Sequence, residues 1–152
     1  MELSQKLEAC LKIETLCEEI YYSLCNIFPQ AKKLFRQLAE EEERHADILT
    51  ISAGFHNLGA LSDIIVPDSS SRIKESLDLA RKVKKEIEAR PILLREALQM
   101  ALELEESIAE VYFNELMTEK SGEEIISHLQ QYYKDEMRHT DRIKQYIIDN
   151  DL

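Results

Sequence analysis

Apolar residues recur along most of the chain at the three- and four-residue spacing of amphipathic helices. Three glycines and three prolines interrupt this pattern, and both residue types tend to end helices. The stretches between them predict four long helices, at about 3–26, 30–55, 92–119 and 123–149. A shorter helix is expected over 72–89, and a single helix over 72–119, kinked at Pro91, is the alternative. Nothing in the pattern favours strands, so the chain is predicted to be all-α.

The expected loops differ in length, and their lengths predict a topology. Short turns near Pro29 and Gly122 join the first two and the last two long helices, so each pair should form an antiparallel hairpin. About 35 residues separate the hairpins, enough at roughly 1.5 Å of helical rise per residue to return the chain to its starting end. We therefore expect residues 1–152 to form a single four-helix bundle with one long crossover that contains a short helix.

Charge and cysteine content exclude several classes of partner. The formal net charge of −11 and a pI near 4.9 argue against binding to nucleic acid or to an anionic membrane surface. No apolar run approaches the length of a membrane span, and the first residues do not resemble a signal peptide. Cys10, Cys17 and Cys25 suit neither a disulfide framework nor a zinc site, which favours a cytoplasmic location.

Acids and histidines repeat within the helical pattern. Residues 10–24 align without gaps to 101–115, and 41–49 to 135–143, so that each half carries a helical glutamate followed by Glu-x-x-His. The repeated residues are Glu14, Glu42 and His45 in the first half, and Glu105, Glu136 and His139 in the second. Residues three apart share a helix face, so the Glu and His of each pair can reach a common point.

All six residues are placed to meet inside the bundle. The glutamates of each hairpin lie about 14 to 15 residues from its turn, roughly 22 Å by helical rise, on mostly apolar stripes. An unpaired carboxylate there would cost several kcal/mol or would take up a proton. Four carboxylates and two neutral imidazoles balance two divalent cations, and this ligand mixture suits iron or manganese. The sequence therefore predicts a two-metal site.

This arrangement resembles that of the ferritin-like di-iron carboxylate proteins, and the chain is most similar to the di-iron domain of rubrerythrins. The resemblance implies a ferritin-like bundle that holds two iron ions, with manganese possible. Glu42 and Glu136 would bridge the metals, Glu14 and Glu105 would be terminal ligands, and each metal would carry one histidine.

The resemblance also implies roles outside the ligand set. Tyr21 and Tyr112, which occupy the same position in the two repeats, would hydrogen-bond a ligand carboxylate. Ile108 stands where rubrerythrins have a further acid, which puts in doubt the change of ligands with redox state that this acid permits. The rubredoxin-type Cys-x-x-Cys pair is also missing from the sequence.

The implied function is reduction of hydrogen peroxide or dioxygen, with electrons from an external donor such as a rubredoxin-like protein. A homodimer or higher homo-oligomer is expected. Two alternatives stay open at this point: a bacterioferritin-like ferroxidase that stores iron, and a metal-free interaction bundle.

Overall fold

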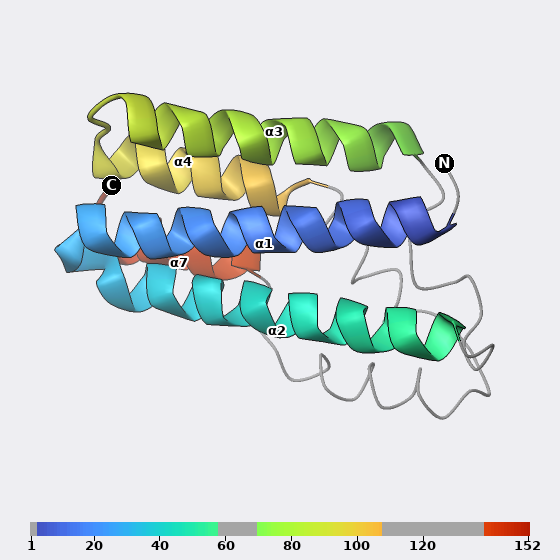
Figure 1. Cartoon of the computed structure of the whole chain (residues 1–152). Helices are drawn as coiled ribbons and strands as arrows, with labels where there is room; N and C mark the ends of the chain where they lie inside the picture. Colours follow the sequence, from blue (N-terminus) through green and yellow to red (C-terminus); the bar gives the residue numbers. More distant parts are fainter. Residues whose placement is uncertain (1–2, 58–69, 108–138) are drawn as a thin grey trace.

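The computed structural model describes residues 3–57, 70–107 and 139–152, and within these ranges all regular structure is helical (Figure 1). The elements are α1 (Leu3–Ile27), the 3-10 turn η1 (Pro29–Ala31), α2 (Lys32–Asn57), α3 (Ser70–Ala89), α4 (Leu94–Glu105) and α7 (His139–Asp149). The prediction of an all-α fold is confirmed.

The first two helices form the expected hairpin. α1 and α2 run antiparallel and lie side by side along their length (Figure 1). Pro29 begins η1 at the turn, where its fixed φ suits the first helical position. The amide of Phe28 still bonds to the carbonyl of Leu24 at 2.9 Å, and the amide of Ala31 bonds to the carbonyl of Phe28 at 3.0 Å. The chain thus reverses direction in a few residues.

The crossover helix α3 lies against α1 and runs in the same direction as it (Figure 1). At its end the chain turns sharply and α4 returns, parallel to α2. Arg90 braces this turn, because its Nη2 atom lies 2.9 Å from carboxylate oxygens of both Glu86 and Glu96. Pro91 has no backbone N–H to donate to the preceding turn, so it interrupts the regular hydrogen bonding of a helix. The two segments are therefore separate helices, and the alternative of one kinked helix is wrong.

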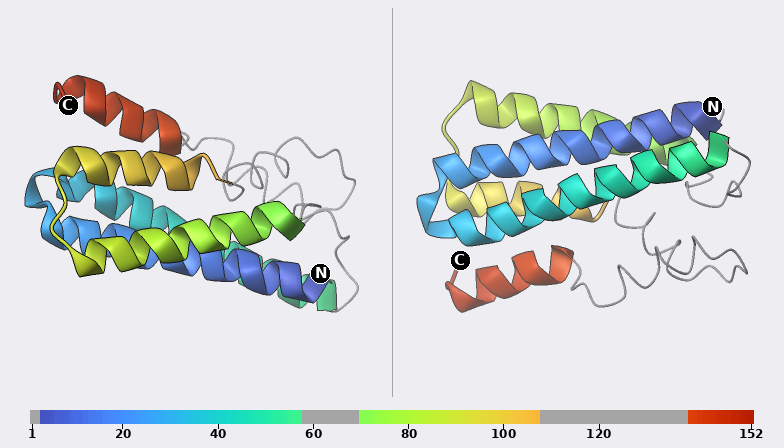
Figure 2. Two further views of the ribbon diagram at one scale, coloured as in Figure 1. Left: turned by 90° about the horizontal axis from the view of Figure 1, so that it is seen from above. Right: turned by 60° about the horizontal axis from the view of Figure 1, so that its bottom comes forward.

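The last described helix, α7, runs antiparallel to α4 and packs against it (Figure 2). α4 is shorter than the predicted helix over 92–119, since it ends at Glu105. The amide of Ser107 bonds to the carbonyl of Leu104 at 3.0 Å, a three-residue spacing that closes the helix in a tighter turn. The rest of that predicted helix, the turn near Gly122 and the first part of the last helix fall outside the described residues.

The core lies between the helices and is built from the predicted apolar stripes. Its largest fully buried side chains are Tyr21, Phe35, Ile13, Ile20, Leu24, Leu38, Leu49, Ile73 and Leu98. Burial of each aliphatic or aromatic side chain of this size contributes about 1.5–3 kcal/mol. Among the helices that the structure describes, none has the length and hydrophobicity to cross a bilayer.

Candidate metal centre

Six carboxylate and imidazole side chains interrupt this apolar core, and none of them is more than 5% exposed. They come from four helices: Glu14 from α1, Glu41, Glu42 and His45 from α2, Glu105 from α4, and His139 from α7. Five of the six are residues predicted as metal ligands. The sixth predicted ligand, Glu136, lies outside the described residues. Charged groups are seldom buried without a partner, so this gathering requires a chemical reason.

Glu42 lies between the two histidines. Its Oε1 atom is 3.0 Å from Nδ1 of His139, and its Oε2 atom is 3.4 Å from Nδ1 of His45. Two further carboxylates flank the pair, since Nδ1 of His139 is 2.6 Å from Glu105 Oε2 and Nδ1 of His45 is 3.5 Å from Glu14 Oε2. The imidazole rings stack with their centroids 5.4 Å apart. Both Nδ1 atoms thus face the same group of carboxylates.

The residues present fit a metal group. One ligand atom from each of Glu42, His45 and His139 can be chosen so that all three lie within 4.8 Å of one another. Oε2 of Glu14 is buried and has no hydrogen-bond partner in the part of the chain that the structure describes. A buried oxygen of this kind is costly unless something positive meets it. Carboxylate oxygens with imidazole nitrogens suit iron or manganese.

Burial and mutual contact shift the pKa values of the acids in this cluster in opposite directions. Burial raises the pKa of Glu14 well above its ordinary value, and repulsion from Glu42 raises it further. Burial acts the same way on Glu42, but hydrogen bonds from Glu14 and His139 and the charge of His139 outweigh it and hold the pKa of Glu42 well below its ordinary value. Glu14 therefore binds its proton more tightly than Glu42 does. Metal binding at such a site releases protons.

Tyr21 makes a hydrogen bond to the predicted ligand Glu105. It is completely buried, and its hydroxyl donates a hydrogen bond to Oε1 of Glu105, while Oε2 of the same carboxylate faces His139. Burial, followed by the charge of Glu105, raises the pKa of Tyr21 well above its ordinary value, so the phenol keeps its proton. The structure therefore brings Tyr21 to a predicted ligand. Tyr112, its counterpart in the repeat, lies outside the described residues.

Glu41 contacts the far side of the His139 ring. Its Oε2 atom is 2.5 Å from Nε2 of His139, and its Oε1 atom accepts a hydrogen bond from Nη1 of Arg142. Arg44 also approaches, with its Nη2 atom 3.7 Å from the same Oε1. Burial acts to raise the pKa of Glu41, but hydrogen bonds from His139 and Arg142 outweigh it and lower the pKa below its ordinary value. Glu41 is therefore a buried carboxylate with a cationic partner at Oε1 and the His139 ring beside Oε2.

Glu41 is not among the predicted ligands, although the sequence carries a signal at its position. Residues 40–43 are four consecutive glutamates. Apart from Glu42, which belongs to the Glu-x-x-His motif, they are typical of a charged segment exposed to solvent. The alignment that pairs Glu42 with Glu136 also pairs Glu41 with Asp135. An acid thus precedes the Glu-x-x-His in both halves, and that repetition marks the position.

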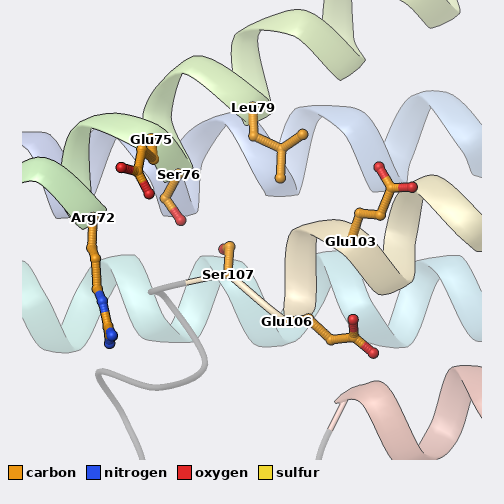
Figure 3. A pocket seen from close by; sticks show the side chains of 7 residues that line it. All are labelled: Arg72, Glu75, Ser76, Leu79, Glu103, Glu106 and Ser107. Atoms are coloured by element: carbon orange, nitrogen blue, oxygen red, sulfur yellow. The ribbon is translucent and has the colours of Figure 1, made fainter.

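A separate pocket of about 320 Å³ opens between α3 and α4 (Figure 3). Its lining includes Arg72, Glu75, Glu103 and Glu106. The last two are exposed and lie close to Glu105 in the sequence, whereas Glu105 itself is buried and does not line the pocket. The pocket therefore does not contain the carboxylate and imidazole cluster.

A helical bundle with a buried cluster of carboxylates and imidazoles, contributed by four helices, is the arrangement found in ferritin-like carboxylate metalloproteins. The sequence model of the family described as Rubrerythrin matches residues 5–147, and the chain belongs to the rubrerythrin family. The matched range includes all six predicted ligands. No curated protein and no solved structure matches the chain. Family membership, together with the cluster, points to a di-iron protein.

Proposed function

We propose that the chain is a di-iron oxidoreductase that reduces hydrogen peroxide or dioxygen to water with electrons from an external donor. The observation that carries this proposal is the position of Glu42, whose two carboxylate oxygens each face Nδ1 of a different histidine. A carboxylate placed between two imidazoles can bridge two metal ions. Glu14 and Glu105 stand beside the two histidines as the terminal ligands that such a pair needs.

The ligand set balances the charge of two ferrous ions. Glu14, Glu42 and Glu105 would supply three negative charges, and Glu136, which the sequence repeat predicts as a ligand, would supply the fourth. The two neutral imidazoles add no charge. Two iron ions, each passing from the ferrous to the ferric state, would supply the two electrons that, with two protons, convert hydrogen peroxide to two molecules of water. Manganese accepts the same ligands, so metal identity is part of the proposal.

The protein's own residues position the ligands and exclude water. Buried residues lie one helical turn from each ligand, and they include Cys10, Cys17, Leu38, Leu49, Ala101 and Ile143. Electrostatic interactions are stronger in such an apolar surrounding than in water. Tyr21 fixes the orientation of the Glu105 carboxylate through its hydroxyl. The ligands are therefore arranged before the metal binds, which lowers the cost of assembling the site.

The electrons are proposed to come from a separate redox centre, such as a rubredoxin-like protein. The three cysteines all lie on α1, are spaced seven and eight residues apart, and are free and buried. They form no Cys-x-x-Cys pair that could hold an electron-carrying iron.

The test is anaerobic titration with ferrous iron, followed by exposure to peroxide and to oxygen in parallel. The wild-type chain should bind two iron ions, and Glu42→Ala should abolish tight binding of the pair. Glu43→Ala is the matched control, because it removes an exposed acid from the next position of α2. Unchanged stoichiometry in Glu42→Ala would end the proposal. Deposition of many ferric ions per chain in a large assembly would instead favour iron storage.

A further inference from the structure

We infer that the external electron donor docks on the side of the bundle formed by α3 and the start of α4, and that this donor is a carrier protein whose contact surface carries carboxylates. We call this docking surface the α3–α4 face; it comprises Leu79, Lys82, Lys85, Leu93, Arg95 and Met100. The inference rests on the proposed function, because a donor is needed only if electrons reach the centre from outside.

Basic residues are concentrated in this part of an acidic chain. Residues 70–95 hold eight of the 19 lysines and arginines but only four of the 30 acids, so this segment has a formal charge of +4 in a chain of −11. At an ionic strength of about 0.15 M the Debye length is about 8 Å, so a docked partner responds mainly to the charges near its contact. The local excess of cations therefore favours a partner with an anionic surface.

Three cations of the α3–α4 face are not engaged within the protein. Some basic residues of α3 pair with acids, as Lys84 does with Glu19 at 2.5 Å. Lys82, Lys85 and Arg95, in contrast, are exposed and form no ion pair with any residue that the structure describes. Lys82 and Lys85 are three residues apart, so they project from one face of α3. All three side chains can therefore meet carboxylates of a partner.

A groove of about 480 Å³ lies beside these cations, between α3 and α4, which run side by side (Figure 1). Lys82 and Arg95 are part of its lining, and Val83, Leu93 and Met100 supply apolar surface. Leu93 is 70% exposed. Protein interfaces combine an apolar centre with a polar rim, and the groove with its cations offers both.

The acids of the groove do not cancel its positive charge. Glu86 and Glu96 share one partner, since each lies 2.9 Å from Nη2 of Arg90. Glu103 lies eight residues beyond Arg95 on α4, about 12 Å further along the helix. Near the turn between α3 and α4, Arg90 and the three unpaired cations thus face two acids. That end of the groove is positive.

The groove is also close to the proposed metal centre. Glu103 lines the groove, whereas Glu105, two residues later, is buried beside His139. Two positions along a helix correspond to about 200° around its axis, so α4 stands between the groove and the centre. A helix with its side chains is about 10–12 Å across. An electron that enters at the groove therefore has one helix to cross.

The electron balance sets the kind of contact. Reduction of one hydrogen peroxide to two waters consumes two electrons and two protons. Two one-electron carriers must therefore dock in turn, lose one electron each and leave in the oxidised state. Electron-transfer contacts of this kind are typically small, below about 1,200 Å² of buried surface, which permits rapid dissociation. A short groove with a charged edge suits such a contact.

The first experiment follows re-reduction of the iron-loaded, oxidised chain without air. The reductants are dithionite, which needs no docking, and a reduced rubredoxin of net negative charge. The double variant Lys82→Glu with Lys85→Glu should lower the second-order rate constant for rubredoxin about tenfold or more, because electrostatic steering is lost, and should leave the rate with dithionite unchanged. The matched control is Lys12→Glu with Lys33→Glu, which reverses two exposed charges on α1 and α2 and should keep the wild-type rates.

A second measurement needs no iron in the chain. Zinc-substituted rubredoxin, which has the same surface but transfers no electron, is titrated into the nitrogen-15-labelled metal-free protein. Backbone signals within 79–103 should shift, and those of the α1–α2 hairpin should not. Leu93→Ala, which removes exposed apolar surface, and the α3 double variant should each weaken these shifts, whereas the control double variant should retain them. All the substituted positions are exposed, and circular dichroism checks that each variant is folded.

The outcomes separate the two proposals. If rubredoxin reduces the α3 double variant as fast as the wild type, or reduces neither while dithionite reduces both, the docking is overturned and the di-iron function stands. A wild-type chain that binds no iron would overturn the di-iron function and the role of a donor with it. A changed oligomeric state in the α3 double variant, with unchanged reduction by rubredoxin, would assign the face to a second copy of the chain and would also overturn the docking.

Discussion

Replacement of Tyr21 by phenylalanine removes one hydroxyl from the centre and leaves the core filled. Tyr21 is completely buried, and its ring stacks on Phe35 with the centroids 6.4 Å apart. Phenylalanine preserves that contact. The hydrogen bond to Oε1 of Glu105 is lost, and the carboxylate loses its neutral donor inside the protein.

The size of the effect follows from this loss. Hydrogen bonds to charged groups contribute about 1.5–3 kcal/mol to stability, and a buried acceptor left without its donor bears the cost of its desolvation. We therefore expect the free energy of unfolding of the metal-free protein to fall by about 1.5–3 kcal/mol in Tyr21→Phe. For a domain of this size, each kcal/mol lowers the Tm by roughly 2–4 °C, which gives a decrease of about 3–12 °C.

The assay is thermal unfolding of the metal-free protein, followed by circular dichroism. The neighbouring residue supplies the matched control, because Tyr22 is 38% exposed and Tyr22→Phe deletes the same hydroxyl from the surface. That variant should stay within about 0.5 kcal/mol of the wild type. Equal Tm values for Tyr21→Phe and Tyr22→Phe would refute the reasoning, because the hydroxyl of Tyr21 would then contribute nothing at Glu105.

Three further predictions concern the core, the thiols and pH. Leu38→Ala, at a position with 0% exposure, should cost about 2–5 kcal/mol in urea unfolding. Leu93→Ala, at 70% exposure, should stay within about 0.5 kcal/mol, and equal losses in the two variants would contradict the placement of the core. Burial raises the pKa of Cys10 to about 12, and all three thiols are buried, so a disulfide reagent should label none of them until the chain unfolds. Rapid labelling of native protein would count against that burial. The raised pKa values of Glu14 and His139 mean that the folded metal-free protein holds protons that the unfolded chain releases, so its stability should fall as the pH rises from 4.5, the ordinary pKa of Glu14, past 6.5, that of His139. A urea midpoint that climbs steadily over this range would be the opposite result.

Two features could be predicted from the sequence because each depends on residues close together in the chain. They are the hairpin of α1 and α2 and the height along it at which Glu14 and Glu42 lie. Pro29 marks the turn, and the helical period then places Glu14 and Glu42 on inward faces. The end of α4 at Glu105 could not be predicted in this way. Apolar residues continue at helical spacing beyond it in the sequence, so no local signal separates Glu105 from Ser107.

The partner of the crossover helix is likewise a tertiary property. The spacing of its apolar residues predicts that α3 has one inward face, but it does not tell which helix that face covers. In the structure α3 lies on α1, and Nζ of Lys84 sits 2.5 Å from a carboxylate oxygen of Glu19. Nothing in the sequence indicates that two charged residues so far apart form an ion pair.

Glu41 illustrates the same limit at the metal centre. A helical stripe identifies Glu42 as inward, yet the next residue back points about 100° away around the helix. Whether that flank is buried depends on the packing of α7, which brings His139 and Arg142 to it. The predicted ligands follow from periodicity and repetition, while the contact of Glu41 with His139 follows from the packing of α2 against α7.

The central claim is that this cluster binds two iron ions as one unit. The most direct measurement is Mössbauer spectroscopy of the chain loaded with iron-57 without air and then oxidised. We predict two iron ions per chain that are magnetically coupled in the oxidised protein, and loss of the coupled pair in Glu42→Ala but not in Glu43→Ala. Iron bound only as isolated, uncoupled ions, or a coupled pair that survives in Glu42→Ala, would contradict the account.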